Sequence, residues 1–284
     1  MINRKFSTLL AVFLFALNLT ACEKDTLEPV DVSVSGEILY EDKELDISGT
    51  TGKTKMQAVR YAFVDLVDVD DAILDTSVTD EQGYYQLKGK GAGLSVRVVA
   101  ATSFTAGTMV RISDYKGNTY AVTKDLEQVN GEQQLDISIN MKSKISGVYN
   151  MLDVFTNAVE LIGSVSSKEM PVVNAFWEPQ KSQYGTYFCP NDTKWGSCPQ
   201  GKGMYLLGGR ANGGDTDEYD DDVLWHEFGH YLESYVGVQD SPGGSHYLTE
   251  NDYDLRLSWS EGWGGFFPTA VKRWLAETNP GRLS

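Results

Sequence analysis

The spacing of the apolar residues changes near residue 142, and this change limits the fold more than any other feature of the chain. From residue 30 to residue 141, apolar and polar residues alternate in short runs, as in 32–40 and 62–69, with turn residues between the runs. Alternation with a period of two is typical of strands that bury one face. Many short strands at regular spacing predict a small antiparallel β-sandwich.

After residue 143 the apolar residues take the spacing of helices. Helical spacing and short apolar runs predict five elements: helices at 148–162, 220–236 and 259–275, and strands at 172–177 and 203–207. We therefore expect a multidomain chain, in which an all-β sandwich at 30–142 is followed by an α+β domain at 143–284.

The charge balance excludes one class of partner. The 284 residues include 24 basic and 40 acidic side chains, which gives a formal net charge of −16. Binding to nucleic-acid phosphates requires basic patches. We therefore expect no nucleic-acid partner.

The first residues have the pattern of an export signal. Arg4 and Lys5 precede an apolar run at 6–19, which is too short to span a membrane comfortably. The run ends in Leu19-Thr20-Ala21-Cys22, which resembles the bacterial lipobox. An ordinary secretory signal with a chance cysteine is the alternative interpretation.

The lipobox resemblance implies a signal peptide at 1–21, a lipid on Cys22 and a polar tether at 22–29. The acidic residues directly after Cys22 also resemble the surface-export signals of some bacterial lipoproteins. Together these two resemblances imply a protein of the bacterial cell envelope. Its lipid would be its only attachment to the outer membrane, and the protein would be displayed on the cell surface.

Two further cysteines, Cys189 and Cys198, are nine positions apart. An exported protein meets an oxidising compartment, so we expect these two residues to form a disulfide. A metal-binding pair is the alternative, but cysteines that bind one metal are usually two to four residues apart.

One motif carries specific chemistry, His226-Glu227-Phe228-Gly229-His230. On a helix, histidines four residues apart leave the same face one turn apart, and both can reach one zinc ion. Glu227 then lies beside the metal, where it can take a proton from the attacking water and deliver it to the leaving amine. This is the HExxH signature of the zincin metallopeptidases, and it predicts a Zn²⁺ cofactor.

The third zinc ligand has to come from outside this motif. A metzincin would have Gly and His at positions 233 and 236, which hold Glu233 and Val236, so that family is excluded. The segment Leu257-Ser-Trp-Ser-Glu261-Gly-Trp-Gly-Gly-Phe-Phe267 resembles the ligand helix of gluzincins such as the M1 aminopeptidases. The resemblance implies that Glu261 is the third ligand.

Two departures from the gluzincin pattern concern the residues around Glu261. The segment between His230 and Glu261 is longer than in thermolysin-like and M1 enzymes. Several gluzincins also carry, four residues after the ligand, an aspartate that orients a zinc histidine, and Gly265 stands there in this chain. Glu233, another nearby acid or a backbone carbonyl is expected to replace it.

His246 is the alternative third ligand, since it is the only other histidine. In a loop between the two helices it could instead stabilise the oxyanion that forms during peptide attack, and Tyr247 could do the same with its hydroxyl. A loop histidine with no role is the remaining interpretation. The acidic run at 215–222 could bind calcium, but helix capping and solvation explain it as well.

A second resemblance concerns the all-β half. The stretch Thr79-Asp80-Glu-Gln-Gly83-Tyr84-Tyr-Gln-Leu87 resembles a hairpin of carboxypeptidase-regulatory-like, transthyretin-like domains. Asp80 starts the turn and Gly83 takes a positive φ. The resemblance implies an accessory module at 30–142 with no catalytic residues.

The combined pattern predicts a gluzincin-like zinc metallopeptidase that acts on a protein or peptide. An endopeptidase is favoured, because the "G-x-M-E-N" element with which M1 enzymes bind the substrate amine is missing. A non-catalytic zinc-containing adhesion protein and a zinc hydrolase of non-peptide bonds are the alternatives. The chain ends at Ser284, soon after Glu261, so it is either a minimal version or part of a longer protein. The substrate and the oligomeric state stay open.

Overall fold

The computed structural model describes residues 27–46, 49–103, 109–192, 194, 196–210, 213–244, 246–247 and 252–283. These residues form two mixed β-sheets and three α-helices. The expected signal peptide and lipid site, Cys22, lie outside them. Among the described helices, none is both long and apolar enough to cross a membrane.

The first sheet is built around one long strand, β1 (Val30–Asp46). Residues of β1 alternate between buried and more exposed positions along most of its length, which explains the period of two in the sequence. Strands β2 (Gly49–Ala58) and β5 (Tyr84–Gly91) pair with it in antiparallel orientation. Strands β9 (Gly131–Gln134) and β10 (Ile137–Ile139) pair with it in parallel orientation. The prediction of a purely antiparallel sandwich was therefore wrong, because the chain returns along β1 in the same direction.

The second sheet has eight strands in the order β12-β13-β11-β7-β6-β3-β4, with β8 paired to β6. Its strands are β3 (Ala62–Val67), β4 (Ile73–Val78), β6 (Ser95–Ser103), β7 (Met109–Ser113), β8 (Ala121–Asp125), β11 (Val173–Phe176), β12 (Tyr187–Cys189) and β13 (Gly203–Tyr205). Strand β11 pairs in parallel with β7, so the sheet runs across the boundary expected at residue 142. One hydrophobic core also extends across that position.

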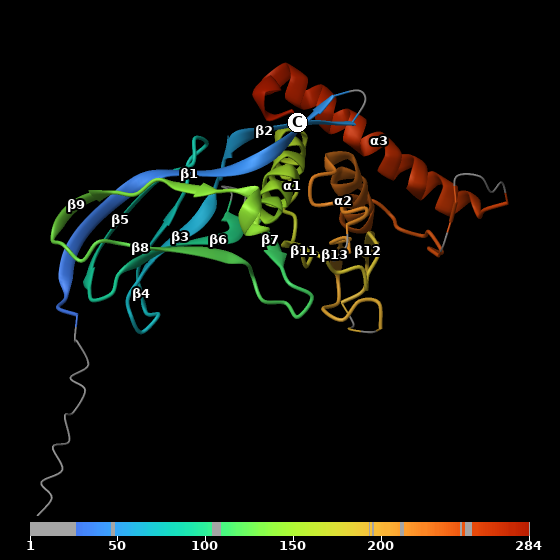
Figure 1. Ribbon diagram of the computed structural model, residues 1–284. Coiled ribbons are helices and arrows are strands. Elements are labelled where there is room, and N and C mark those ends of the chain that lie inside the picture. Colours follow the sequence, from blue (N-terminus) through green and yellow to red (C-terminus); the bar gives the residue numbers. More distant parts are fainter. Residues whose placement is uncertain are drawn as a thin grey trace, which may run out of the picture.

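Three helices cover the end of this sheet, α1 (Ser146–Val165), α2 (Asp221–Tyr235) and α3 (Leu255–Thr278). Short 3₁₀ turns lie at Met141–Ser143 and Pro280–Arg282. Helix α1 packs against β1, β6 and β7, α2 lies beside α1 and packs against β12 and β13, and α3 runs along the outer side of α1 and α2 (Figure 1). All three helices were predicted, and Asp220 caps α2 as expected by accepting from the backbone N–H of Val223.

The core under α2 is aromatic. The ring of Phe228 stacks on Phe155 of α1 at 6.3 Å and on Phe267 of α3 at 5.6 Å between centroids. The indole N–H of Trp225 donates to the carbonyl of Val154 at 2.8 Å. These contacts fix the rotation of α2 about its own axis. They therefore determine the direction in which the opposite face of the helix points.

The turn at residues 79–84 differs from its prediction in one respect. The carboxylate of Asp80 accepts from the backbone N–H groups of Gln82 and Tyr84, and Gly83 has a φ of +80°. The turn is therefore formed as expected. It is not a hairpin, because β4 pairs with β3 in one sheet and β5 pairs with β1 in the other.

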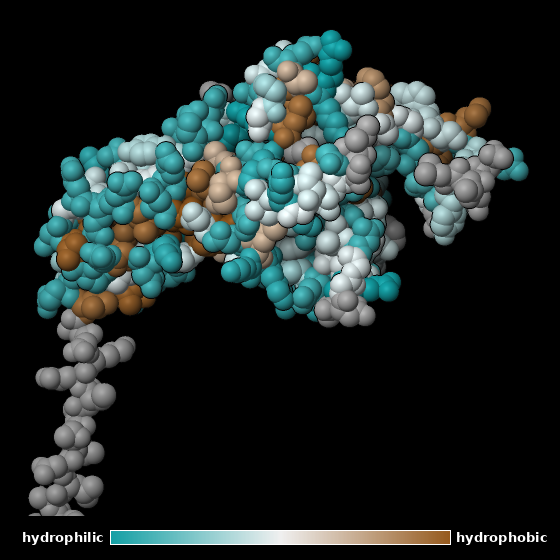
Figure 2. Space-filling model, turned by 45° about the horizontal axis from the view of Figure 1, so that its top comes forward, coloured by the Kyte–Doolittle hydropathy of each residue, from teal (hydrophilic) through white to brown (hydrophobic). Residues whose placement is uncertain are grey.

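The surface on the face that Figure 2 shows is largely hydrophilic, with apolar residues in scattered groups. This agrees with the excess of acidic side chains in the sequence. Most acidic side chains are exposed, but Asp42 on β1 is buried close to Asp221 of α2. Changing Asp42 therefore tests the packing between β1 and α2.

The side chain of Asp42 on β1 is buried, and its nearest cation is Lys55 at 3.9 Å. Burial and the nearby carboxylate of Asp221 raise the pKa of Asp42 from 3.8 to about 7. From about pH 4 to 7 the unfolded chain has released this proton while the folded chain keeps it, so stability falls as the pH rises through this window. Above it, the ionised group destabilises the fold.

We therefore expect Asp42→Asn to raise the free energy of unfolding at pH 8 by about 2 kcal/mol, roughly half of what the full pKa shift would give. The gain is expected to disappear below about pH 4. Urea unfolding at pH 4, 6 and 8 measures it. A variant that is less stable than wild type at pH 8 would contradict the assigned burial.

Candidate metal centre

Helices α2 and α3 approach each other closely at two glycines. A Cβ on Gly229 would lie 3.2 Å from the Cα of Gly264. The indole N–H of Trp263 donates to the carbonyl of Gly229 at 2.9 Å and links the two helices at this point. Because these positions lack side chains, residues on the facing sides of α2 and α3 can meet.

Three donor groups meet there, His226 and His230 from α2 and Glu261 from α3. Their nearest atoms are 3.0 Å apart for the two Nε2 atoms, 3.2 Å for His226 Nε2 and Glu261 Oε2, and 3.6 Å for His230 Nε2 and Glu261 Oε1. Ligands about 2.1 Å from one tetrahedral ion lie about 3.4 Å from each other. The three donors therefore have the spacing of a tetrahedral metal site.

The site is closed on one side and open on the other. The side chain of His230 is 11% exposed, while those of His226 and Glu261 are 30% and 25% exposed. A site with three protein donors and an accessible side leaves a fourth position for water or substrate. Catalytic zinc sites in other proteins keep such an open position, whereas structural zinc sites are closed.

The charges of the donors depend on one another. Burial would raise the pKa of Glu261, but hydrogen bonds from His226 and His230 outweigh it and hold that pKa well below its usual range. Burial would lower the pKa of His230, but Glu261 and Glu227 outweigh it and raise that pKa. Glu261 is thus kept as a carboxylate, the form that binds a cation.

A buried serine connects His230 to Glu233. The Oγ of Ser260 lies 3.2 Å from His230 Nδ1 and donates to Glu233 Oε2 at 2.5 Å. Since the serine hydrogen goes to Glu233, Nδ1 of His230 carries the proton that Ser260 accepts, and Nε2 is left with the lone pair a metal needs. Glu233 was one of the alternatives predicted to orient a histidine. Its Oε2 lies 3.8 Å from His230 Nδ1, and the hydrogen bonds between the two side chains run through Ser260, which was not predicted.

Glu227 lies beside these donors and is not one of them. Its side chain is buried, and burial raises its pKa. Its Oε2 atom has no hydrogen-bond partner among the described residues. A buried carboxylate oxygen without a partner is costly, and a water or substrate at a neighbouring metal would satisfy it. The residues therefore fit a metal that carries such a ligand.

The loop after α2 places His246 next to Glu261. His246 Nε2 lies 3.2 Å from Glu261 Oε2, and its side chain is 42% exposed. The group of three donors within 4.8 Å of one another contains Glu261 and not His246. Tyr247 is exposed, and among the described residues no contact joins its hydroxyl to the cluster. The ring of Tyr253 packs edge-on against His246, at 6.4 Å between centroids.

A pocket of about 630 Å³ opens beside His226 and Glu227. Its walls come from α2, from α3 and from the segment between β13 and α2. The other lining residues are Thr186, Leu207, Asp215, Asp217, Asp222, Val223, Gly265, Pro268, Thr269 and Lys272.

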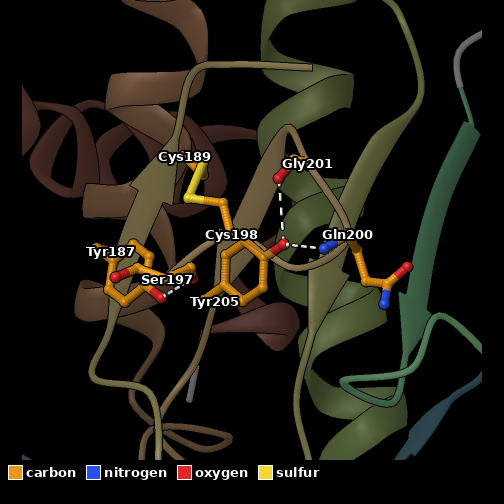
Figure 3. Close-up of a disulfide and its surroundings, with 7 residues drawn as sticks. All are labelled: Tyr187, Cys189, Ser197, Cys198, Gln200, Gly201 and Tyr205. Atoms are coloured by element: carbon orange, nitrogen blue, oxygen red, sulfur yellow. Dashed lines mark hydrogen bonds between the residues drawn. A yellow bond between two sulfur atoms is a disulfide. The ribbon is translucent and has the colours of Figure 1, made fainter. Parts of the chain in front are cut away.

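Strand β12 borders α2 on the side of the β-sheet, and a disulfide holds its end. Cys189 and Cys198 are bonded, as predicted, and both are buried. The hydroxyl of Tyr205 accepts from the backbone N–H of Gln200 and donates to the carbonyl of Gly201 (Figure 3). These contacts tie the segment after β12 back onto β13.

The packing of Gly264 against His226 makes a local prediction. A Cβ at Gly264 would lie 2.8 Å from Cε1 of the His226 imidazole. We therefore expect Gly264→Ala to displace that ring and to weaken zinc binding about 10–100-fold, as the loss of a residue that supports a ligand does. Competition with a chromogenic chelator measures the affinity.

Gly262 on the same helix is the matched control, because a Cβ added there would have no atom within 4 Å and the residue is exposed. Gly262→Ala should keep wild-type zinc affinity and stabilise the fold by about 0.5–1 kcal/mol. Equal zinc affinities for the two variants would mean that His226 is not held against Gly264.

No family model and no curated protein matches this chain. Among solved structures, a 9R-lipoxygenase from Cyanothece PCC8801 aligns with 37% of this chain and 16% of its own length. The aligned residues are 12% identical and the TM-score is 0.19. A similarity this slight supports no conclusion about fold or function.

Proposed function

We propose that this protein is a zinc-dependent peptidase. The observation that carries the proposal is the geometry around Glu227: three donors at 3.0–3.6 Å from one another, and a buried carboxylate beside them that is not a donor. His226, His230 and Glu261 would hold the ion. Zinc, when bound, would polarise the peptide carbonyl and make water a better nucleophile.

The side chains of this chain would then divide the remaining work. Glu227 accepts the proton of the attacking water and delivers it to the nitrogen of the leaving amine. Ser260 and Glu233 keep the proton of His230 on Nδ1. His246, next to Glu261 on the exposed side, would stabilise the negative charge that develops on the carbonyl oxygen.

The finer fold assignment belongs to the same proposal. We propose that residues 143–284 are gluzincin-like and that residues 30–142 are carboxypeptidase-regulatory-like, with the two parts sharing one sheet and one hydrophobic core. The peptidase is further proposed to be a lipoprotein of the bacterial cell envelope, anchored through Cys22. The support for the anchor is the sequence pattern before Cys22 alone.

The test uses the chain from Glu23 onward. Wild type is expected to contain one zinc ion per chain by elemental analysis and to cleave casein or a labelled peptide library. A chelator should abolish cleavage, and zinc should restore it. A chain without zinc would refute the proposal. A chain that keeps its zinc and cleaves no peptide would favour a binding protein or a hydrolase of other bonds.

A further inference from the structure

Three aspartates line the pocket together with Glu227, and among the described residues only one of the three has a cationic partner. Asp222 forms an ion pair with Lys272 at 2.6 Å. Among the described residues, no Lys, Arg or His pairs with Asp215 or Asp217, although both line the same pocket. The pocket therefore carries uncompensated negative charge.

Asp217 is held firmly in the pocket wall. Its side chain is buried, with 6% of the residue exposed, and the hydroxyl of Thr186 donates to its Oδ2. The same hydroxyl accepts from the backbone N–H of Leu207, whose carbonyl accepts from the backbone N–H of Asp217. This ring of bonds fixes the carboxylate before any ligand arrives, so little ordering is needed on binding.

A buried carboxylate without a counter-charge is unfavourable. Burial raises the pKa of Asp217, and the neighbouring carboxylates of Asp215, Asp220 and Glu218 raise it further. The unpartnered Oε2 of Glu227, a residue that is 6% exposed, belongs to the same pocket and also calls for a ligand there. A ligand that brings a positive charge relieves the burial of the Asp217 carboxylate, while Glu227 Oε2 needs a hydrogen-bond donor, which the attacking water or the substrate itself provides.

The residues that line the pocket favour an elongated cation as the ligand over a metal ion. Among the described residues, only His226, His230 and Glu261 place three donors within 4.8 Å of one another, so the aspartates of the pocket do not form such a group. The wall also includes the apolar side chains of Leu207, Val223 and Pro268. Apolar walls that lead to a carboxylate suit the methylene stem and charged end of lysine or arginine.

We propose that this pocket selects substrates with a lysine or arginine side chain next to the scissile bond, and that Asp217 and Asp215 are the residues that recognise the cation. This inference rests on the proposed function, since it assumes that a peptide bond is cleaved next to the pocket. The recognition itself depends only on the pocket and can be measured without turnover.

The test measures peptide binding to zinc-loaded protein that carries Glu227→Gln, in which bound peptides are not cleaved. The probes are fluorescent peptides with lysine, arginine, norleucine or glutamate at one position, each with a free and with an acetylated N-terminus. Lysine and arginine peptides are expected to bind about tenfold more tightly than the norleucine peptide. Acetylation is expected to change nothing.

Adding Asp217→Asn should remove this preference, because asparagine keeps the acceptor for Thr186 and loses the charge. Asp215→Asn, at an exposed position where misfolding is not expected, should reduce it. Glu132→Gln is the matched control, since it removes one exposed charge from β9 in the first sheet, outside the pocket. The preference should survive that change.

Equal binding of lysine and norleucine peptides would overturn the proposal, as would a preference that both aspartate variants retain. A preference that follows the free N-terminus instead of the side chain would also overturn it, since the cation would then be the α-amine. Wild type that binds lysine peptides tightly and cleaves none would refute the peptidase assignment and leave this one standing.

Discussion

Glu227→Gln is expected to yield a protein that binds one zinc ion as tightly as wild type and hydrolyses peptides about 10²–10⁴-fold more slowly. Glutamine has the shape of glutamate but cannot accept the proton of the attacking water. Zinc affinity should be unchanged, because Glu227 is not among the three donors that lie together. The measurement is kcat on one labelled peptide, with zinc content determined on the same samples.

Loss of activity through misfolding can be separated from loss of the base. Burial raises the pKa of Glu227, so its ionised form destabilises the metal-free fold at neutral pH. Glutamine removes that penalty, and the metal-free variant should unfold at a higher temperature than metal-free wild type. A variant that is inactive and less stable would argue for a structural role, and one with wild-type kcat would refute the assignment of Glu227 as the base.

Glu261→Ala is expected to abolish stoichiometric zinc binding. This substitution removes one of the three donors. The loss of zinc affinity should therefore exceed the roughly 10–100-fold loss that follows when a residue supporting a ligand is changed. Since the carboxylate also lies 3.2 Å from both His226 Nε2 and His246 Nε2, its removal should leave the histidines without a common anionic partner. Zinc titration against a competing chelator measures the affinity.

Two further variants make this result specific. Glu277→Ala changes an exposed glutamate of the same helix and should keep the zinc. His246→Ala should also keep it, with a lower kcat if His246 stabilises the oxyanion. Zinc that survives Glu261→Ala and is lost with His246→Ala would identify the histidine as the third ligand.

Most of the secondary structure could be predicted because burial imposes a period on the sequence. Strands β1, β3 and β6 and all three helices bury one face or more, and their apolar residues recur accordingly. Strands β2, β4, β9 and β12 were missed. Strands β2 and β9 are two examples. Their residues are largely exposed, so no alternation marks them, and only pairing with β1 makes them strands.

The relation between the two halves of the chain could not be predicted either. The change of period near residue 142 indicates two kinds of structure, and from the sequence it predicts a boundary between domains. Strand β11 nevertheless pairs with β7, which precedes that position by some thirty residues. Pairing between strands so far apart depends on hydrogen bonds between backbones, and backbone groups leave no mark on the sequence.

The sequence by itself determined the chemistry that lies within one helix. His226, Glu227 and His230 are placed relative to one another by helical geometry alone, whatever the rest of the chain does. The cysteine pair was similarly predictable, because the short segment between the two residues keeps them near each other.

Only the tertiary structure decided what surrounds that helix. Ser260 reaches His230, Gly264 makes room for His226, and Asp217 lines the pocket, and in each case the residue is distant in sequence or lies on another element. A serine, a glycine and an aspartate are common residues with no periodic signal. Their roles depend on how α3 and the segment before α2 pack against one face of α2. The packing of side chains in the core determines that arrangement.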